Sequence, residues 1–183
     1  MPPQSPTAAY IAVGSNEGER VLRCEEAVAA VAALPQTTVT RRSAWYETEP
    51  VVDPAVHAAE DRPSWFINGV AEVTTTLSPQ ALFDHCLRIE QRMGRVRPGT
   101  RADRVPLSRP IDLDLLLHGD TVLQNESLTL PHPRFHHRRF VLMPMAELAP
   151  TLRHPTLHLT MAELLERLSD PHQVTPASPA PHR

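Results

Sequence analysis

Lysine is absent from this 183-residue sequence, and all 18 of its basic residues are arginines. A Walker-type phosphate-binding loop, whose lysine contacts the bound phosphates, is therefore excluded. A phosphate that is held by a side-chain cation other than histidine must be held by arginine. The formal net charge is only −3, so no overall field marks the chain as a binder of nucleic acid or of an acidic membrane.

Cysteines and long apolar runs are also scarce. The two cysteines, Cys24 and Cys86, stand outside any CxxC spacing in predicted amphipathic helices, which indicates reduced core residues. The sequence has no apolar run of membrane-spanning length, and its N-terminus MPPQSPT lacks a basic-then-apolar signal pattern. With 41% hydrophobic and 21% charged residues, the composition predicts an ordinary globular protein of the cytoplasm.

The pattern of apolar residues predicts alternating strands and helices. The expected elements are a strand at 9–15, a helix ending before Pro35, strands at 37–48 and 65–76, a helix at 79–94 capped by Ser78, a strand at 111–118, and helical regions at about 136–148 and 160–168. The first six follow the order strand, helix, strand, strand, helix, strand. This order predicts an α+β fold, in which helices pack on one face of a ferredoxin-like antiparallel sheet.

The remaining segments divide the chain into one domain and two ends. Residues 8–170 are expected to form a single domain after a flexible N-terminus at 1–7. The proline-rich residues 171–183 are expected to be disordered. Two long loops, at 49–64 and 95–109, interrupt the domain. We expect the second to be mobile when empty and to close over bound substrate.

The segment SRPIDLDLLLHGD places two aspartates, Asp112 and Asp114, within an apolar run. Side chains alternate between the faces of a strand, so the two carboxylates point the same way while Leu113 points the other. Such a pair requires a solvated face, a shared proton or a cation between the carboxylates. Taken alone, the motif most often marks a solvated face.

Seven arginines between residues 88 and 109 precede this acidic pair. Arginine forks suit phosphate oxygens, and carboxylates suit Mg²⁺, which usually keeps water ligands and is shared with substrate phosphates. Together the two features indicate Mg²⁺-nucleotide chemistry. The other interpretation is a loop whose arginines form salt bridges over its own carboxylates, and the sequence leaves both open.

Three further patterns carry polar residues of less specific meaning. The segment GSN before the first helix suits a phosphate-binding turn or, by default, a tight turn in which Asn or Ser caps the helix. The segment LPHPRFHHRRF contains three histidines but no cysteine or HExxH pattern, so zinc is not expected, and contact of His132 and Arg138 with phosphate or ribose fits better. Phe66 and Asn68 share one strand face and suit a flat heterocycle.

Five segments, in this order, resemble the signatures of the 6-hydroxymethyl-7,8-dihydropterin pyrophosphokinase family: YIAVGSNEGER, SAWYETEPV, FINGVAEVTTTLSPQALFDHCLRIEQRMGRVR, SRPIDLDLLLHGD and LTLPHPRFHHRRFVLMPMAELAP. The resemblance implies transfer of pyrophosphate from ATP to the hydroxymethyl group of the pterin, with release of AMP, in folate biosynthesis. It also implies two Mg²⁺ ions, ATP as co-substrate and a ferredoxin-like monomer without nucleic-acid or membrane partners.

The resemblance further implies roles for individual residues. Asp112 and Asp114 would hold the Mg²⁺ ions, and Arg95 and Arg109 would be the catalytic arginines. The implied ATP-binding residues are Glu90, Arg97, Leu115, Leu128, Thr129, His132 and Arg138, with the two leucines near the adenine. The implied pterin-binding residues are Thr48, Val51, Phe66, Asn68 and Phe140, with the two aromatic rings on either side of the pterin.

A noncatalytic alternative stays open at this point. Ferredoxin-like sheets also serve as ligand-sensing or RNA-binding modules, because a fold does not determine a function. A binding module has no evident use for an acidic pair among phosphate-binding arginines, and an RNA-binding sheet would show paired aromatic residues without the acidic pair. Release of AMP that depends on the pterin would distinguish the two classes.

Overall fold

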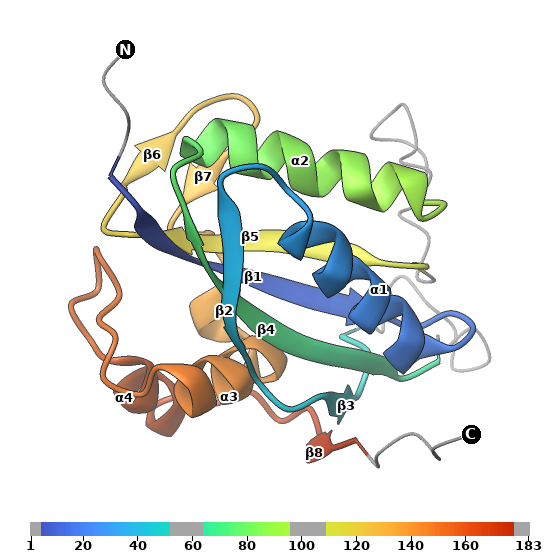
Figure 1. The fold of residues 1–183 in the computed structure, drawn as a ribbon. Helices are drawn as coiled ribbons and strands as arrows, with labels where there is room; N and C mark the ends of the chain where they lie inside the picture. Colours follow the sequence, from blue (N-terminus) through green and yellow to red (C-terminus); the bar gives the residue numbers. More distant parts are fainter. Residues whose placement is uncertain (1–4, 52–63, 96–108, 178–183) are drawn as a thin grey trace.

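The computed structural model describes residues 5–51, 64–95 and 109–177, which form a sheet with helices on both faces (Figure 1). The strands are β1 (Thr7–Ser15), β2 (Thr37–Arg42), β3 (Tyr46–Thr48), β4 (Phe66–Thr75), β5 (Asp112–His118), β6 (Leu123–Gln124), β7 (Thr129–Leu130) and β8 (Val174–Pro176). The helices are α1 (Arg20–Ala32), α2 (Pro79–Arg92), α3 (Arg139–Leu148) and α4 (Met161–Glu166), and a 3-10 turn, η2, covers Phe135–His137.

The main sheet is antiparallel and has the strand order β5-β1-β4-β3-β8. Strand β2 pairs with β4 as well, beyond the short segment that pairs with β3. Strand β1 therefore lies between β4 and β5, and the predicted order of strand, helix, strand, strand, helix, strand is confirmed. The α+β class is confirmed with it. Strands β6 and β7 form a separate hairpin.

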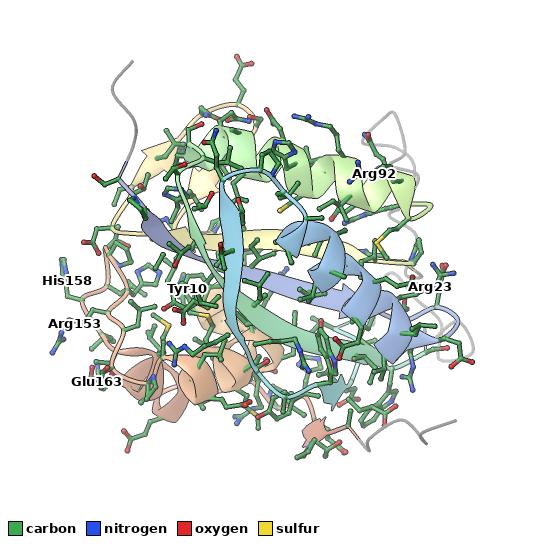
Figure 2. All side chains as sticks on the ribbon, viewed as in Figure 1. Tyr10, Arg23, Arg92, Arg153, His158 and Glu163 are labelled. Atoms are coloured by element: carbon green, nitrogen blue, oxygen red, sulfur yellow. The ribbon has the colours of Figure 1, made fainter. Side chains whose placement is uncertain are left out.

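Helices cover both faces of the main sheet, whereas the sequence predicts helices on one face. Helices α1 and α2 pack on the face that carries Ile11 and Leu113, and α3 and α4 pack on the face that carries Tyr10 and Leu117 (Figure 1). Figure 2 shows Tyr10 within the molecule, while Arg153, His158 and Glu163 lie at its periphery. Tyr10 and Ile11 are neighbours in β1 and both are buried, so this strand requires cover on both sides.

The two helices on the first face begin in different ways. Ser78 caps α2 as predicted, because its Oγ accepts a hydrogen bond from a backbone N–H of the first turn at 3.2 Å. Helix α1 has Glu19 at its N-cap and no side-chain cap. The default expectation that the segment GSN caps this helix is therefore wrong. Ser15 and Asn16 bond instead to residues 109 and 110, far along the chain.

The predicted strand at 37–48 is divided into β2 and β3, and the intervening residues bend inward. Ser43 accepts a hydrogen bond on its Oγ from Val70 N at 3.0 Å. Trp45 is only 8% exposed and packs over Gly69 of β4, where an added Cβ would lie 2.6 Å from a carbon of the indole ring. A glycine in β4 thus makes room for the tryptophan that interrupts the neighbouring strand.

Both ends of the domain differ from the expected boundaries. Strand β1 already begins at Thr7, within the expected flexible N-terminus. The predicted disorder from residue 171 is wrong for Val174–Pro176, which forms β8 against β3 at one end of the sheet (Figure 1). Asp170 fixes the start of this segment, since its Oδ2 accepts a hydrogen bond from Arg139 N at 2.8 Å. The composition of the C-terminal segment does not predict this strand, because the residues that hold the segment in place belong to β3 and α3.

Both cysteines are buried core residues, as predicted. Cys24 and Cys86 form no disulfide, and burial raises the pKa of each thiol to about 12. A thiol with so high a pKa carries almost no thiolate at neutral pH, which makes it a poor nucleophile. Within the described residues, no helix has the length and apolar character needed to span a membrane.

Candidate active site

Asp112 and Asp114 lie at the start of β5 and share one face of the sheet. Leu113 and Leu115 alternate with them and are 1% and 2% exposed in the core beside α1 and α2. The predicted alternation is confirmed. The aspartates therefore face the opposite side, where α3 and α4 pack, and their side chains are 20% and 36% exposed. Asp114 is the more accessible of the two.

Arg95 and Arg109 both contact Asp112 in this structure. The Arg95 guanidinium group donates to Asp112 Oδ1, and Arg109 Nη1 donates to Asp112 Oδ2 at 2.6 Å. These are the salt bridges of the alternative interpretation that the sequence left open. Guanidinium groups and metal ions compete for the same carboxylate oxygens, so a metal ion on Asp112 would have to displace these arginines.

Glu90 of α2 supports both the acidic strand and Arg95. Its side chain is 1% exposed, and Oε1 accepts a hydrogen bond from Leu113 N at 2.8 Å and from Arg95 Nη1 at 2.5 Å. Leu113 lies between the two aspartates on a strand at the edge of the sheet. Glu90 therefore holds the backbone of the acidic pair in place. Its predicted contact with ATP stays a prediction.

The two aspartates differ in their affinity for protons. Burial alone would raise the pKa of Asp112, but Arg95 and Arg109 outweigh this effect and hold the pKa below its usual value. Burial, together with the negative charge of Asp112, raises the pKa of Asp114 to about 6. Asp112 is thus an anion at neutral pH, whereas Asp114 gains a proton in mildly acidic solution. A bound cation would favour the charged form of both.

His132 and Arg138 flank Asp114 from the segment that leads into α3. His132 Nε2 and Arg138 Nη1 each lie 3.9 Å from Asp114 Oδ2, which is beyond hydrogen-bond distance. His132 Nδ1 accepts a hydrogen bond from Arg134 N at 3.3 Å, so the neutral ring carries its proton on Nε2. Burial, followed by the charges of Arg138 and Arg134, lowers the pKa of His132 to about 4. A neutral donor and a cation therefore stand beside the acidic strand, as binding of phosphate oxygens requires.

Three of the predicted pterin-binding residues lie together where the end of β3 pairs with the start of β4. Thr48 and Phe66 are register partners, and Asn68 Nδ2 donates a hydrogen bond to Thr48 Oγ1 at 2.7 Å. Phe66 and Asn68 point to the same face because they are two residues apart in a strand. Phe140 comes from the first turn of α3, and its ring lies 5.5 Å from the guanidinium carbon of Arg138. Val51 is 56% exposed.

The other predicted ATP contacts are less directly placed. Thr129 is half-buried in the short strand β7. Leu115 and Leu128 are 2% and 5% exposed, so little of either side chain is open to an adenine ring. Arg97 lies outside the described residues. The same holds for most of both long loops, so the predicted motion of the second loop stays a prediction.

Sequence reasoning missed the part that Asn16 plays in building the site. Asn16 Oδ1 accepts a hydrogen bond from Arg109 N at 2.6 Å, and Ser15 Oγ donates to Pro110 O at 2.8 Å. Both residues are almost completely buried at the end of β1. A polar pair at the end of a buried strand was the available signal, because buried polar groups need partners. Asn16 thereby fixes the backbone from which the Arg109 side chain extends.

The C-terminal segment also adds residues beside the site. A cavity of about 320 Å³ lies next to Arg138 and Val51. Its lining consists of Val51, His137, Arg138, Leu168, Ser169, Asp170, Pro171 and His172. The last five were not predicted as site residues, because the sequence places Leu168 at the end of a helical region, Ser169 and Asp170 at the end of the domain, and Pro171 and His172 in a disordered tail. The cavity that they line therefore also contains Arg138, a predicted ATP contact, and Val51, a predicted pterin contact.

The donor set on β5 suits Mg²⁺. In the part of the chain that the structure describes, no group of three or more His, Cys, Asp and Glu side chains is arranged to hold a metal ion. Asp112 and Asp114 supply oxygen atoms, and Mg²⁺ usually completes its coordination with waters and substrate phosphates. The residues present therefore fit a magnesium ion that binds together with a nucleotide.

Arginines beside a pair of strand carboxylates are typical of enzymes that transfer phosphoryl groups from a nucleotide, and the composition of the site is compatible with this class. The comparison with known families is more specific. Residues 10–150 match the family 7,8-dihydro-6-hydroxymethylpterin-pyrophosphokinase (HPPK), and the chain belongs to this family. Membership decides against the noncatalytic alternative.

Individual relatives agree with this assignment. The chain is 36% identical over 171 residues to the 2-amino-4-hydroxy-6-hydroxymethyldihydropteridine pyrophosphokinase of Haemophilus influenzae, with 93% of this chain and 98% of that protein covered. It is 37% identical over 160 residues to the folic acid synthesis protein fol1 of Schizosaccharomyces pombe, covering 87% of this chain and 20% of that protein. The crystal structure of wild-type Plasmodium falciparum HPPK-DHPS with pteroate shares the fold, with a TM-score of 0.66 and 14% identity over 89% of this chain and 44% of that one.

Proposed function

We propose that Asp112 and Asp114 hold the Mg²⁺ with which this pyrophosphokinase transfers pyrophosphate from ATP to the hydroxymethyl group of 6-hydroxymethyl-7,8-dihydropterin. The observation that supports this proposal is the register of the sheet. Asp112, Gly14 and Asn68 are successive partners on β5, β1 and β4. Neighbouring strands are about 4.8 Å apart, so the backbones that carry the Asp112 carboxylate and the Asn68 amide are roughly 10 Å apart, and both side chains lie on one face of the sheet.

The cationic side chains would bind and stabilise the phosphates. Arg138 and the neutral His132 would contact phosphate oxygens. Arg95 and Arg109, once detached from Asp112, would stabilise the charge that develops on the transferred group and on the departing AMP. We propose that two Mg²⁺ ions bind. When bound, they would neutralise charge on the phosphates.

The pterin residues would position the nucleophile. Asn68 and Thr48 together offer both donor and acceptor atoms to the polar edge of the ring, and Phe66 and Phe140 offer apolar surfaces for its faces. A ring that is held in this way directs its hydroxymethyl oxygen at the β-phosphate of ATP. Positioning supplies most of the rate in such a transfer, so the site requires no strong general base.

The proposal is tested by incubating the protein with ATP and the pterin, with Mg²⁺ or with EDTA, and by measuring AMP. We expect AMP release that requires both the pterin and Mg²⁺. Equal AMP release without the pterin would indicate hydrolysis, and ADP in place of AMP would indicate transfer of a single phosphate. Full activity in EDTA would disprove the metal assignment. We also propose that the active form is a monomer, which sedimentation equilibrium in the same buffer would check.

Replacing Asn68 with alanine should weaken pterin binding much more than ATP binding. Loss of buried hydrogen bonds to a heterocycle costs about 1–3 kcal/mol, which is about a fivefold to a 150-fold increase in Kd. Isothermal titration calorimetry with each substrate measures the two effects. The variant Thr48→Ser keeps the hydroxyl group that accepts from Asn68 and should bind pterin nearly as the original protein does. A larger effect of Asn68→Ala on ATP would place the pterin elsewhere.

A further inference from the structure

Gly14 of β1 lies between the acidic half and the pterin half of the site. In the sheet it pairs with Asp112 on one side and with Asn68 on the other. Its backbone is extended and its φ angle is not positive, unlike those of Gly18 and Gly94. Any amino acid can adopt this conformation, so the backbone gives no reason for glycine at this position.

Glycine is required at residue 14 for a steric reason, which involves one atom of Asn68. A Cβ on Gly14 would overlap Asn68 Oδ1, whereas the next atoms, Asn68 Cγ and Ile67 O, would lie at 3.4 and 3.7 Å. Asn68 is held in this position because its Nδ2 donates to Thr48 Oγ1 at 2.7 Å. The missing side chain at residue 14 is therefore what allows the Asn68 amide to lie against β1.

We infer that Gly14 is a positioning residue for the pterin site, acting through Asn68. The inference rests on the proposed function, because it takes Asn68 as a pterin contact. A methyl group at residue 14 would displace the Asn68 amide and break its hydrogen bond to Thr48. The cations assigned to phosphate, His132 and Arg138, come from another segment and would keep their positions.

Gly69 provides a matched comparison on the neighbouring strand. A Cβ there would lie 2.6 and 2.7 Å from two ring carbons of Trp45. Trp45 is a core residue that cannot move without repacking its surroundings, whereas Asn68 is only half-buried and its amide can rotate. Gly69→Ala should therefore reduce the stability of the protein, whereas Gly14→Ala should reduce its affinity for the pterin.

Calorimetric titration of Gly14→Ala with the pterin, in the presence of Mg²⁺ and a non-hydrolysable ATP analogue, tests the inference. We expect the pterin Kd to rise about fivefold or more, as for the loss of Asn68 itself. The Kd of the nucleotide analogue and the melting temperature should stay close to those of the original protein, while Gly69→Ala should lower the melting temperature. Unchanged pterin affinity in Gly14→Ala, or a loss of stability as large as that of Gly69→Ala, would overturn the inference.

A double-mutant cycle separates an effect through Asn68 from direct obstruction of the ligand. In the Asn68→Ala background the amide is gone, so Gly14→Ala should cause little further loss of pterin affinity. An additional loss of the same size as in the original background would overturn the inference, because the methyl group would then block the pterin itself. Failure of the original protein to bind pterin at all would instead contradict the proposed function.

Discussion

Asp114→Asn should lower kcat by about a hundredfold or more, with ATP and pterin at saturation. Asparagine replaces a charged ligand by a neutral one, and a metal ion contributes several kcal/mol of charge stabilisation in the transition state, where 1.36 kcal/mol corresponds to a factor of ten. Turnover measured over a range of Mg²⁺ concentrations checks this result. Asp120, an exposed aspartate just after β5, provides the control variant Asp120→Asn, which should keep normal turnover. Normal turnover of Asp114→Asn at saturating Mg²⁺ would refute the metal assignment.

The same variant should be at least as stable as the original protein when metal is absent. The folded protein raises the pKa of Asp114 from 3.8 to about 6, so folding favours the protonated form. The stability associated with this group is fully present below pH 3.8 and is lost as the pH rises through about 6. Asparagine imitates the protonated form at every pH. The melting temperature of Asp114→Asn in EDTA should therefore match the original near pH 4 and equal or exceed it at pH 7.5, and a lower value at pH 7.5 would contradict the raised pKa.

Arg109→Ala should reduce kcat by about a hundredfold, while the dissociation constants of ATP and the pterin change little. An interaction that is made mainly in the transition state affects turnover more than ground-state affinity. Arg109 donates a hydrogen bond to Asp112 Oδ2 at 2.6 Å, and this bond would have to break before the guanidinium group could reach the transferred phosphates. Arg153→Ala changes an arginine at the periphery and should leave turnover unchanged (Figure 2). If the whole defect of Arg109→Ala is lost ATP affinity, Arg109 is an ordinary binding contact.

The same substitution should have the opposite effect on metal binding. Arg109 Nη1 lies 2.6 Å from Asp112 Oδ2, so it occupies an oxygen atom that a metal ion would use. Removing this competitor should increase the affinity of the ligand-free protein for Mn²⁺, a paramagnetic substitute for Mg²⁺ that is followed by electron paramagnetic resonance. Weaker Mn²⁺ binding in Arg109→Ala would show that the arginine does not compete with the metal.

The sequence predicted those features that depend on neighbouring residues. The alternation of Asp112 with Leu113 sets the face of each side chain, because a strand has a period of two residues wherever it lies. The helix cap at Ser78 and the order of the main elements also follow from residues that are close together in the sequence. These signals are sufficient to predict the α+β sheet and to place both aspartates on one face of it.

The sequence could not show which distant segments meet. Arg95 and Arg109 are two of seven arginines in one stretch, and nothing in that stretch indicates that these two converge on Asp112. In the sequence Asn16 resembles a helix cap, but its hydrogen-bond partner is Arg109, 93 positions further along the chain. The second helical layer was missed because the order of elements alone does not show which face α3 and α4 cover.

Strand β8 has a consequence for how molecules of this protein behave toward one another. It occupies the outer edge of β3, where Ala177 N donates to Trp45 O at 2.8 Å and Glu49 N donates to Gln173 O at 3.0 Å. Unpaired strand edges are templates on which a second chain can add a strand, and natural proteins avoid this by covering them. The short segment thus limits edge-to-edge association, since its Pro176 lacks an N–H group through which another strand would extend the sheet.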